Sequence, residues 1–308
     1  MGPDERHQIA ALARGRVQED VPLARFSTYR VGGPADLLVE PADADDLAAL
    51  LPLLHSGGWP LLILGGGSNL LIADEGLRGV AIRLSAPAFQ RIEPFEVPGE
   101  EGPRLRVGGG VRVSRLMGRT GREGWSRLTF LEGIPGTVGG CVRMNAGTAE
   151  GEIKDVLCAA ELVGRDGSRR TLSAADCGFA YRRSELPAGA VVTEATLSAG
   201  AGDPGEIRDH LRDLHTRRKA TQPVGTSGGS VFKNPPGDHA GRLIDAAGLK
   251  GSSIGGARVS EIHANFIRTE PDAKAADVRA LMRRCAGAVK ERLGVELELE
   301  NILVGFDR

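Results

Sequence analysis

Two glycine clusters constrain the fold of this chain more than any other feature of its sequence. The first, Gly65-Gly66-Gly67-Ser68-Asn69, follows the apolar run Trp59–Leu64, and the second is Gly133-Ile134-Pro135-Gly136-Thr137-Val138-Gly139-Gly140. Glycine lets the backbone turn with positive φ and come close to a ligand, and the N–H groups of such a turn can form a nest for phosphate oxygens. A tight connection after a strand is the simpler interpretation of one cluster alone. Two clusters, with Asn145-Ala146-Gly147 just beyond the second, favour a ligand that carries a diphosphate.

The spacing of these glycines excludes two common nucleotide sites. Neither cluster reads G-x-G-x-x-G at the start of a helix, and the pattern G-x-x-x-x-G-K-[ST] does not occur. A Rossmann dinucleotide site and a P-loop are therefore disfavoured, and composition alone does not name the cofactor.

Apolar periodicity predicts the regular elements around the clusters. Asp45 and Asp46 open a helix whose leucines repeat on one face, and Asp-Gly within Gly164–Gly167 predicts a hairpin turn. The Gly- and Pro-containing stretch 199–204 predicts a domain boundary. Further elements are expected as follows: a buried strand at Trp59–Leu64, strands at Val80–Leu84 and Ala190–Leu197, a helix near Pro271–Leu293 and a closing strand at Val295–Phe306.

Composition excludes several classes of partner. The formal net charge is -1, which gives no electrostatic reason to expect a nucleic acid or an anionic membrane as partner. The N-terminal segment has no apolar core of a signal peptide, and no stretch is long enough to span a bilayer. The four cysteines show neither a C-x-x-C pair nor a zinc-type spacing. We expect reduced thiols, no bound metal and a cytoplasmic location.

Several motifs together resemble one enzyme family. They are LILGGGSNLL, GIPGTVGG, NAG, FAYRRSEL, GGSVFKNP, AGRLIDAAGLKG, HANFI and GVELELENILVGF, spread from about Phe26 to Phe306. Their order and spacing resemble the UDP-N-acetylenolpyruvoylglucosamine reductase (MurB) family, in a compact subtype without the extra substrate-lid insertion. The resemblance implies an α+β chain with a two-lobed FAD-binding domain of the PCMH/VAO-like type and a smaller C-terminal α+β substrate domain. We expect an N-terminal segment at 1–25, the FAD-binding domain at 26–200 and the substrate domain at 201–308.

The resemblance also implies a reaction. In the family, NADPH reduces a tightly but non-covalently bound FAD, and a hydride from flavin N5 adds to the β-carbon of the enolpyruvyl group of UDP-N-acetylglucosamine enolpyruvate. The negative charge that develops over the α-carbon and the carboxylate needs a cation or hydrogen-bond donors, followed by a proton. The expected partners are NADPH and UDP-N-acetylglucosamine enolpyruvate, and the sequence indicates no obligate protein partner.

Three residues match the catalytic positions of the family. Ser230, within Gly228-Gly229-Ser230, matches the proton donor, although a serine among glycines usually bonds its own turn. Arg182 matches the arginine that steadies the enolate, and a guanidinium can grip a carboxylate through two N–H groups. Its neighbour Arg183 is distinguished from it only by the family's Y-R-x-S pattern. Glu300 matches the C-terminal glutamate.

The pattern around Glu300 carries information of its own. Val295, Leu297 and Leu299 share one parity along the strand, whereas Ile302, Val304 and Phe306 share the other. The apolar face therefore changes sides near Glu300, which predicts a bulge or a strand that moves between environments. Glu300 has the parity of the later apolar residues, so a partly buried carboxylate is expected; a solvated face of Glu296, Glu298 and Glu300 is the alternative.

The remaining site residues are carried over from the motifs. The cofactor-binding set is predicted to be Gly65, Gly66, Gly67, Ser68, Asn69, Gly133, Ile134, Pro135, Gly136, Thr137, Gly139, Gly140, Asn145 and Gly147. The predicted substrate contacts are Tyr181, Lys219, Lys233 and Asn234, with Arg217 or Arg218 as alternatives to Lys219. His263 and Asn265 are expected to be structural.

The chain departs from the family pattern in two places. Thr148-Ala149-Glu150 stands where many members continue the N-A-G motif with Ala-Tyr-Gly, and Asn301-Ile302 stands where many have Val-Arg. Two other functions remain open at this point: another FAD-dependent oxidase of the same superfamily, which would reduce O2 and need neither Ser230 nor Glu300, and a flavin- or nucleotide-sugar-binding protein without catalysis.

Overall fold

The leucine-patterned segment forms helix α2 (Ala44–Ser56), and the leucines that repeat on its inner face are buried: Leu47, Leu50, Leu51 and Leu54. The helix begins one residue earlier than the sequence indicated, because Asp43 is its N-cap and its side chain accepts the main-chain N–H groups of Asp45 and Asp46. Asp46 itself is buried and accepts three main-chain N–H groups from the segments that follow helix α1 (Pro3–Leu12) and precede α2. A buried carboxylate with three donors is well satisfied.

The computed structural model describes residues 1–306, which form two compact units. Unit 1 comprises Met1–Glu19, Leu37–Gly66 and Gly79–Arg217; unit 2 comprises Asp20–Asp36, Gly67–Arg78 and the chain from Arg218 onward. These units differ from the division at residues 200 and 201 that composition suggested, and that division stays a prediction. One reason for the difference is local: helix α5 (Pro204–Thr221) packs Leu211 against the largest apolar core of unit 1.

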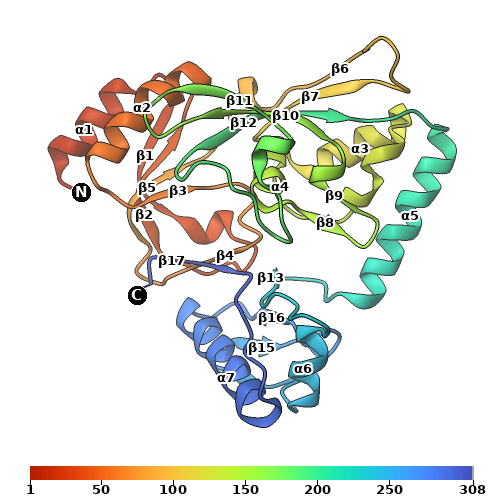
Figure 1. Cartoon of the computed structure of the whole chain (residues 1–308). Coiled ribbons are helices and arrows are strands. Elements are labelled where there is room, and N and C mark those ends of the chain that lie inside the picture. The colour runs from red at the N-terminus through yellow and green to blue at the C-terminus, as the bar shows by residue number, and fades with distance from the viewer. Residues whose placement is uncertain (307–308) are drawn as a thin grey trace. The chain divides into compact units, whose positions relative to one another are not determined.

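Most of the strands lie in the first two thirds of the chain (Figure 1). The strands are β1 (Arg16–Pro22), β2 (Pro34–Glu40), β3 (Leu61–Ile63), β4 (Leu70–Ile72), β5 (Leu77–Ile82), β6 (Ile92–Phe95), β7 (Arg104–Gly108), β8 (Gly147–Thr148), β9 (Gly151–Glu152), β10 (Leu157–Val163), β11 (Arg169–Ser173) and β12 (Val191–Ser198). The helices among them are α3 (Val113–Glu123) and α4 (Val138–Met144), with short 3-10 turns at Leu23–Phe26, Pro87–Phe89, Ser126–Leu131, Ile153–Asp155 and Ala175–Cys177.

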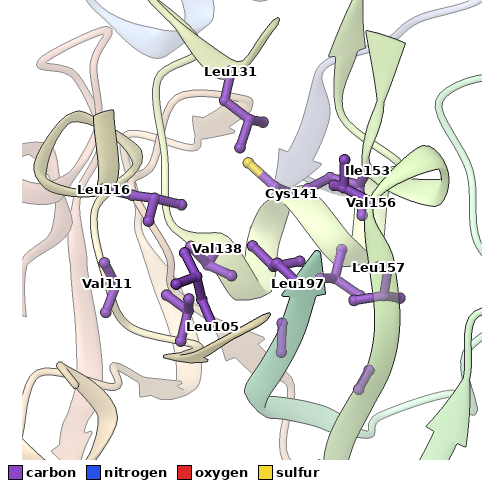
Figure 2. Close-up of a cluster of buried hydrophobic side chains, with 14 of the residues drawn as sticks. Leu105, Val111, Leu116, Leu131, Val138, Cys141, Ile153, Val156, Leu157 and Leu197 are labelled. Carbon is purple, nitrogen blue, oxygen red and sulfur yellow. The ribbon is translucent and has the colours of Figure 1, made fainter. Parts of the chain in front are cut away.

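Unit 1 is built on an antiparallel sheet of five strands in the order β11-β10-β12-β7-β6. The hairpin between β10 and β11 turns at the predicted Asp-Gly, which confirms that prediction. Leu116 of α3 and Cys141 of α4 pack with Leu105 and Leu197 of the sheet in one buried cluster (Figure 2). A second cluster joins the leucines of α2 to Ile9 of α1 and to neighbouring strands.

Strand β3, which precedes the first glycine cluster, is shorter and less buried than expected. Strand β3 pairs in parallel with β5, and four strands follow the order β1-β2-β5-β3 in their sheet. Ile63 at the end of β3 is 36% exposed instead of buried. Its side chain lines the cavity described below, so the apolar run at Trp59–Leu64 serves a surface as well as a core.

Unit 2 closes with a small sheet and a long helix (Figure 1). Its elements beyond β4 are β13 (Ser227–Ser230), α6 (Ala240–Ala246), β14 (Ser253–Ile254), β15 (Ala257–Val259), β16 (Phe266–Thr269), α7 (Ala275–Leu293) and β17 (Ile302–Val304). The sheet order is β13-β16-β15-β14. The predicted helix near Pro271–Leu293 is α7, and Leu293, at its last turn, is 40% exposed. The other apolar residues on the same side of the helix are buried: Val278, Leu281, Met282, Cys285 and Val289.

Two absences hold for the part of the chain that the structure describes. No helix among residues 1–306 has the length and apolar character that crossing a bilayer requires. Within the same residues, no group of three or more His, Cys, Asp and Glu side chains is arranged to hold a metal ion. The four cysteines are unpaired, and three of them are buried.

Candidate functional site: a glycine-lined cavity and the Ser230 bulge

Unit 1 contains a cavity of about 560 Å³ whose wall includes residues of both glycine clusters. Gly65 contributes from the first cluster, and Thr137, Gly139 and Gly140 contribute from the second. The apolar part of the wall includes Leu61, Ile63 and Leu64, and the cationic part consists of Arg83, Arg112, Arg115 and Arg143. A wall of this kind suits an extended ligand that carries both an aromatic body and an anionic group.

The two glycine clusters touch each other where they reach this cavity. A Cβ placed on Gly66 would lie 2.5 Å from the Cα of Gly136, and one placed on Gly65 would lie 2.9 Å from Oγ1 of Thr137. Carbon atoms in ordinary contact are about 3.5–4.0 Å apart, so at Gly66 only glycine fits. The clusters thus form one cradle of main chain, and a side chain at Gly66 would force it open.

The second cluster leads directly into α4. Thr137 is the N-cap of this helix, and its Oγ1 accepts the N–H of Gly140 at 3.4 Å. Asn145 ends the helix with φ +43 and is fully buried. Its side-chain amide donates to Glu152 and to the Ala180 carbonyl, while its Oδ1 accepts the N–H of Lys154. Any flavin contact of Asn145 would therefore use its main chain and not its amide.

Arg182 lies at the tip of a two-residue turn in unit 1. Ala180 and Arg183 exchange main-chain hydrogen bonds of 3.0 and 3.1 Å, so Tyr181 and Arg182 form the tip between them. Arg182 has φ +53, which is uncommon for a residue with a side chain and is found most often where function requires it. The guanidinium of Arg182 lies over the ring of Tyr181, whereas the exposed Arg183 pairs with Glu185 at 2.6 Å. Arg182, the arginine that the family pattern indicates, is therefore half-buried, whereas Arg183 is exposed.

Helix α4 and its C-cap hold the turn that carries Arg182. Ser184 donates from Oγ to the carbonyl of Arg143 at 2.6 Å, and Asn145 bonds the Ala180 carbonyl at 3.1 Å. Arg143 in turn donates to the carbonyls of Leu186 and Ala190. Burial lowers the pKa of the Arg143 guanidinium, which nonetheless stays charged because an arginine pKa begins so high. The second glycine cluster and the Arg182 turn are therefore fixed by the same helix.

Ser230 in unit 2 follows a bulge in strand β13. Ser227 pairs with Arg268 and Ser230 pairs with Phe266, so Gly228 and Gly229 together oppose a single residue of β16. Gly229 adopts φ +74, a conformation that other residues rarely adopt. Bulges re-aim the side chains that follow them and are common beside active sites. Ser230 is half-buried at the end of this bulge.

Glu300 lies next to Ser230 through the main chain of Val231. The N–H groups of Glu300 and Asn301 both donate to the Val231 carbonyl, at 2.8 and 3.3 Å. Before this point Leu299 bridges Phe232, and after it β17 runs parallel to β4. The segment therefore does move from one partner to another at Glu300, as its apolar pattern predicted, and Glu300 is partly buried.

The strand predicted at Val295–Phe306 is wrong in extent. Only Ile302–Val304 forms β17, because Glu300 and Asn301 share one acceptor and leave the ladder at that point. Ile302 is 47% exposed, so it does not belong to the later apolar face, whereas Val304 is buried.

The other predicted substrate residues lie in varied surroundings. Lys233 pairs with Glu298 through its ammonium group, and its main chain bonds the same residue. Asn234 is exposed, and its Oδ1 accepts the N–H of Ala240 at 3.1 Å at the start of α6. Lys219 lies exposed in the last turn of α5, and Tyr181 is 51% exposed.

Sequence reasoning missed the side chains that surround the Ser230 bulge. Asn301, regarded only as a departure from a family pattern, is 4% exposed and bonds Tyr29, Asn69 and the bulge. No local pattern could reveal this, because 272 residues separate Tyr29 from Asn301. Asn265 was expected to be structural, and it exchanges two hydrogen bonds with the main chain of Phe232.

Comparisons with known proteins agree with this arrangement. Residues 35–173 match the FAD binding domain family, and residues 221–304 match the C-terminal domain of UDP-N-acetylenolpyruvoylglucosamine reductase. A reductase of that name from Anaeromyxobacter sp. (strain Fw109-5) is 48% identical over 98% of this chain and 93% of its own length. The crystal structure of the Thermus caldophilus enzyme of this family has a TM-score of 0.80 and 39% identity, and covers 94% of this chain and 99% of that one.

A more distant likeness concerns the fold alone. A Physcomitrella patens BBE-like protein has a TM-score of 0.58 at 12% identity, and covers 93% of this chain and 88% of that one. The predicted fold, an FAD-binding domain of the PCMH/VAO-like type followed by a smaller α+β domain, is confirmed. With nearly full-length relatives and family matches in both parts, this chain belongs to the UDP-N-acetylenolpyruvoylglucosamine reductase family.

Proposed function

We propose that this chain reduces UDP-N-acetylglucosamine enolpyruvate to UDP-N-acetylmuramate with NADPH, using FAD as its bound cofactor, in the synthesis of peptidoglycan precursors. The observation that carries the proposal is the junction at Val231, whose carbonyl accepts the N–H of Glu300 directly after the bulge that presents Ser230. A flavoprotein that oxidised a substrate with O2 would have little need for a serine and a glutamate that the main chain of Val231 links. The oxidase and the non-catalytic alternatives are therefore disfavoured.

The residues of unit 1 fit an FAD. Gly65, Gly66 and Gly136 form a main-chain cradle that a Cβ would fill, and the cavity beside it carries four arginines. Main-chain N–H groups and guanidinium groups suit a diphosphate, and the apolar wall at Leu61 and Ile63 suits an aromatic ring system. When bound, FAD supplies the redox chemistry, taking a hydride from NADPH and giving it to the enolpyruvyl β-carbon.

Arg182 stabilises the charge that develops on the substrate. A hydride added at the β-carbon leaves an enolate spread over the α-carbon and the carboxylate, and a permanently charged guanidinium lowers the energy of that state. The tight turn between Ala180 and Arg183 supports this role, because it holds Arg182 in one backbone conformation before the substrate arrives. A group positioned in advance costs no reorganisation during the reaction.

Ser230 gives the proton to the α-carbon. An ordinary hydroxyl is a weak acid, so its proton leaves only where nearby groups stabilise the oxygen for a moment. Glu300 takes part in that stabilisation or returns a proton to Ser230. Its partial burial and its main-chain link beside Ser230 support this assignment.

The remaining predicted contacts are assigned by residue type. Lys219, with Arg217 or Arg218 as alternatives, and Lys233 would hold the diphosphate of the UDP-sugar, and Asn234 and Tyr181 its polar and ring surfaces. Contact by Lys233 requires its ammonium group to leave Glu298 or to bind while paired with it. Unpaired thiols suit a reducing compartment, and we propose the cytoplasm.

The test is isolation of the product. Purified protein is incubated with NADPH and the enolpyruvyl sugar, and mass spectrometry follows conversion to a product heavier by two hydrogens. Ser230→Ala should lower the turnover number by roughly 10²- to 10⁴-fold, the contribution typical of a positioned acid. Ser227→Ala, in the same strand before the bulge, is the matched control and should retain activity. NADPH consumption without the heavier product, or full activity in Ser230→Ala, would overturn the proposal.

A further inference from the structure

Asn301 is the centre of a buried polar cluster in unit 2. The two hydrogens of its Nδ2 serve three acceptors, Oδ1 of Asn69 at 2.8 Å, the Gly228 carbonyl at 3.0 Å and the Ser230 carbonyl at 3.1 Å, so one hydrogen is shared. Its Oδ1 accepts the hydroxyl of Tyr29 at 2.7 Å. Asn301 is 4% exposed and Tyr29 is fully buried, so water competes little for these groups.

The chemistry of the partners fixes the orientation of the Asn301 amide. Carbonyl and amide oxygens accept only, so the NH2 group has to face Asn69 and the two carbonyls of the bulge. The Tyr29 hydroxyl then donates to the remaining oxygen. Burial raises the pKa of Tyr29 far above its ordinary value, which keeps the phenol protonated and able to donate.

The two carbonyls that Asn301 holds belong to Gly228, in the bulge, and to Ser230, the proposed proton donor. Gly228 and Ser230 stand on either side of Gly229, and one amide binds both of their carbonyls. The ring of Tyr29 presses on the same place, since a Cβ on Gly228 would lie 2.1 Å from its Cε2. The direction of the Ser230 side chain therefore depends on a side chain beyond the strand itself.

Glu300 is tied to the same cluster from the other side. Asn69 donates from Nδ2 to the Glu300 carbonyl at 2.9 Å, and its own carbonyl accepts the N–H of Ile302. Asn301 follows Glu300 directly, so a single movement of this amide would displace Ser230 and Glu300 together. Three segments far apart in the sequence, at Tyr29, Asn69 and Asn301, meet in this cluster.

We propose that Asn301 is a positioning residue for proton delivery, which holds the Gly228–Gly229 bulge and Glu300 in fixed register, with Tyr29 orienting its amide. The inference rests on the proposed function. Asn301 itself acts through the main chain of Ser230 and Glu300. A valine, which the family pattern often carries at this position, fills a similar volume and makes none of the side-chain hydrogen bonds.

The two half-reactions of the FAD-loaded enzyme separate positioning from folding. Rapid mixing with NADPH measures flavin bleaching, which needs no proton from Ser230, and mixing the reduced enzyme with the enolpyruvyl sugar measures recovery of colour. Asn301→Val should leave bleaching within about twofold, yet slow recovery by roughly 10- to 100-fold, as small misplacements of a catalytic group do. The solvent deuterium isotope effect on recovery should rise, because proton delivery then limits the step.

Matched variants keep the inference testable. Tyr29→Phe keeps the ring against Gly228 and should slow recovery in the same direction by a smaller factor, even where Asn301→Val folds poorly. Ser260→Ala removes a different buried hydroxyl of unit 2, which accepts the N–H groups of Ile262 and His263 at 3.2 and 3.3 Å, and should leave both half-reactions unchanged. The inference would be overturned if Asn301→Val and Tyr29→Phe slowed both half-reactions equally. It would also be overturned if these variants slowed neither half-reaction. A wild-type enzyme whose colour the sugar does not restore would instead overturn the proposed function.

Discussion

The contact between the two glycine clusters predicts the effect of a single added methyl group. In Gly66→Ala the new Cβ would lie 2.5 Å from the Cα of Gly136 and 3.1 Å from its nitrogen. An ordinary carbon contact requires about 3.5–4.0 Å, so the two loops would have to separate by about 1 Å. Overpacking of this kind costs about 1–3 kcal/mol. Because FAD binding requires the cradle to be closed, we expect roughly 5- to 150-fold weaker FAD binding.

The assay is titration of the flavin-free protein with FAD, followed by quenching of flavin fluorescence. Gly118→Ala is the matched control, because a Cβ at Gly118 in α3 would meet no atom within 4 Å. Exchanging glycine for alanine inside a helix favours the fold by about 0.5–1 kcal/mol, so this control should bind FAD like the wild type. FAD affinity of Gly66→Ala within twofold of the wild type, with unchanged stability, would refute the packing argument.

Three further predictions concern buried polar and thiol groups. Asn265→Ala removes the side chain that bonds the N–H and the carbonyl of Phe232. The free energy of unfolding, measured by calorimetry, should therefore fall by roughly 2–4 kcal/mol. A loss below about 1 kcal/mol would contradict the structural role of Asn265. Burial lowers the pKa of His263, so the unfolded chain takes up a proton first as pH falls below about 6.5. Stability should therefore decrease from pH 7.5 to 5.5 in urea titrations, and His263→Gln should show a weaker decrease. Burial raises the pKa of Cys141 to about 12. In the folded protein a thiol reagent should therefore modify only the partly exposed Cys158, whereas after denaturation it should modify all four cysteines. Rapid labelling of Cys141 in the native state would contradict this.

The sequence predicts best the features that local patterns encode. The leucines of α2 repeat with helical spacing, and their burial follows from that spacing. The Asp-Gly turn between β10 and β11 follows from the φ preference of glycine. Even the change of environment at Glu300 could be read from the alternation of apolar residues, because a strand that changes partners must change its buried face.

The features that the sequence did not predict depend on contacts between distant residues. The extent of β17 is set by β4, more than 200 residues earlier, and the shared acceptor at Val231 shortens the strand. Asn301 has no local signal, since its partners Tyr29 and Asn69 lie at the other end of the chain. The φ of Arg182 follows from the two hydrogen bonds that close its turn, which residue types alone do not specify.

In the proposed reaction, this flavoprotein passes electrons from NADPH to an enolpyruvyl sugar. Its most direct test is an anaerobic visible spectrum of the FAD-loaded protein, recorded after NADPH and again after UDP-N-acetylglucosamine enolpyruvate. We expect NADPH to bleach the flavin band and the sugar to restore it in the absence of O2. A band that stays bleached with the sugar and returns only when air is admitted would rule out this reaction and favour an oxidase.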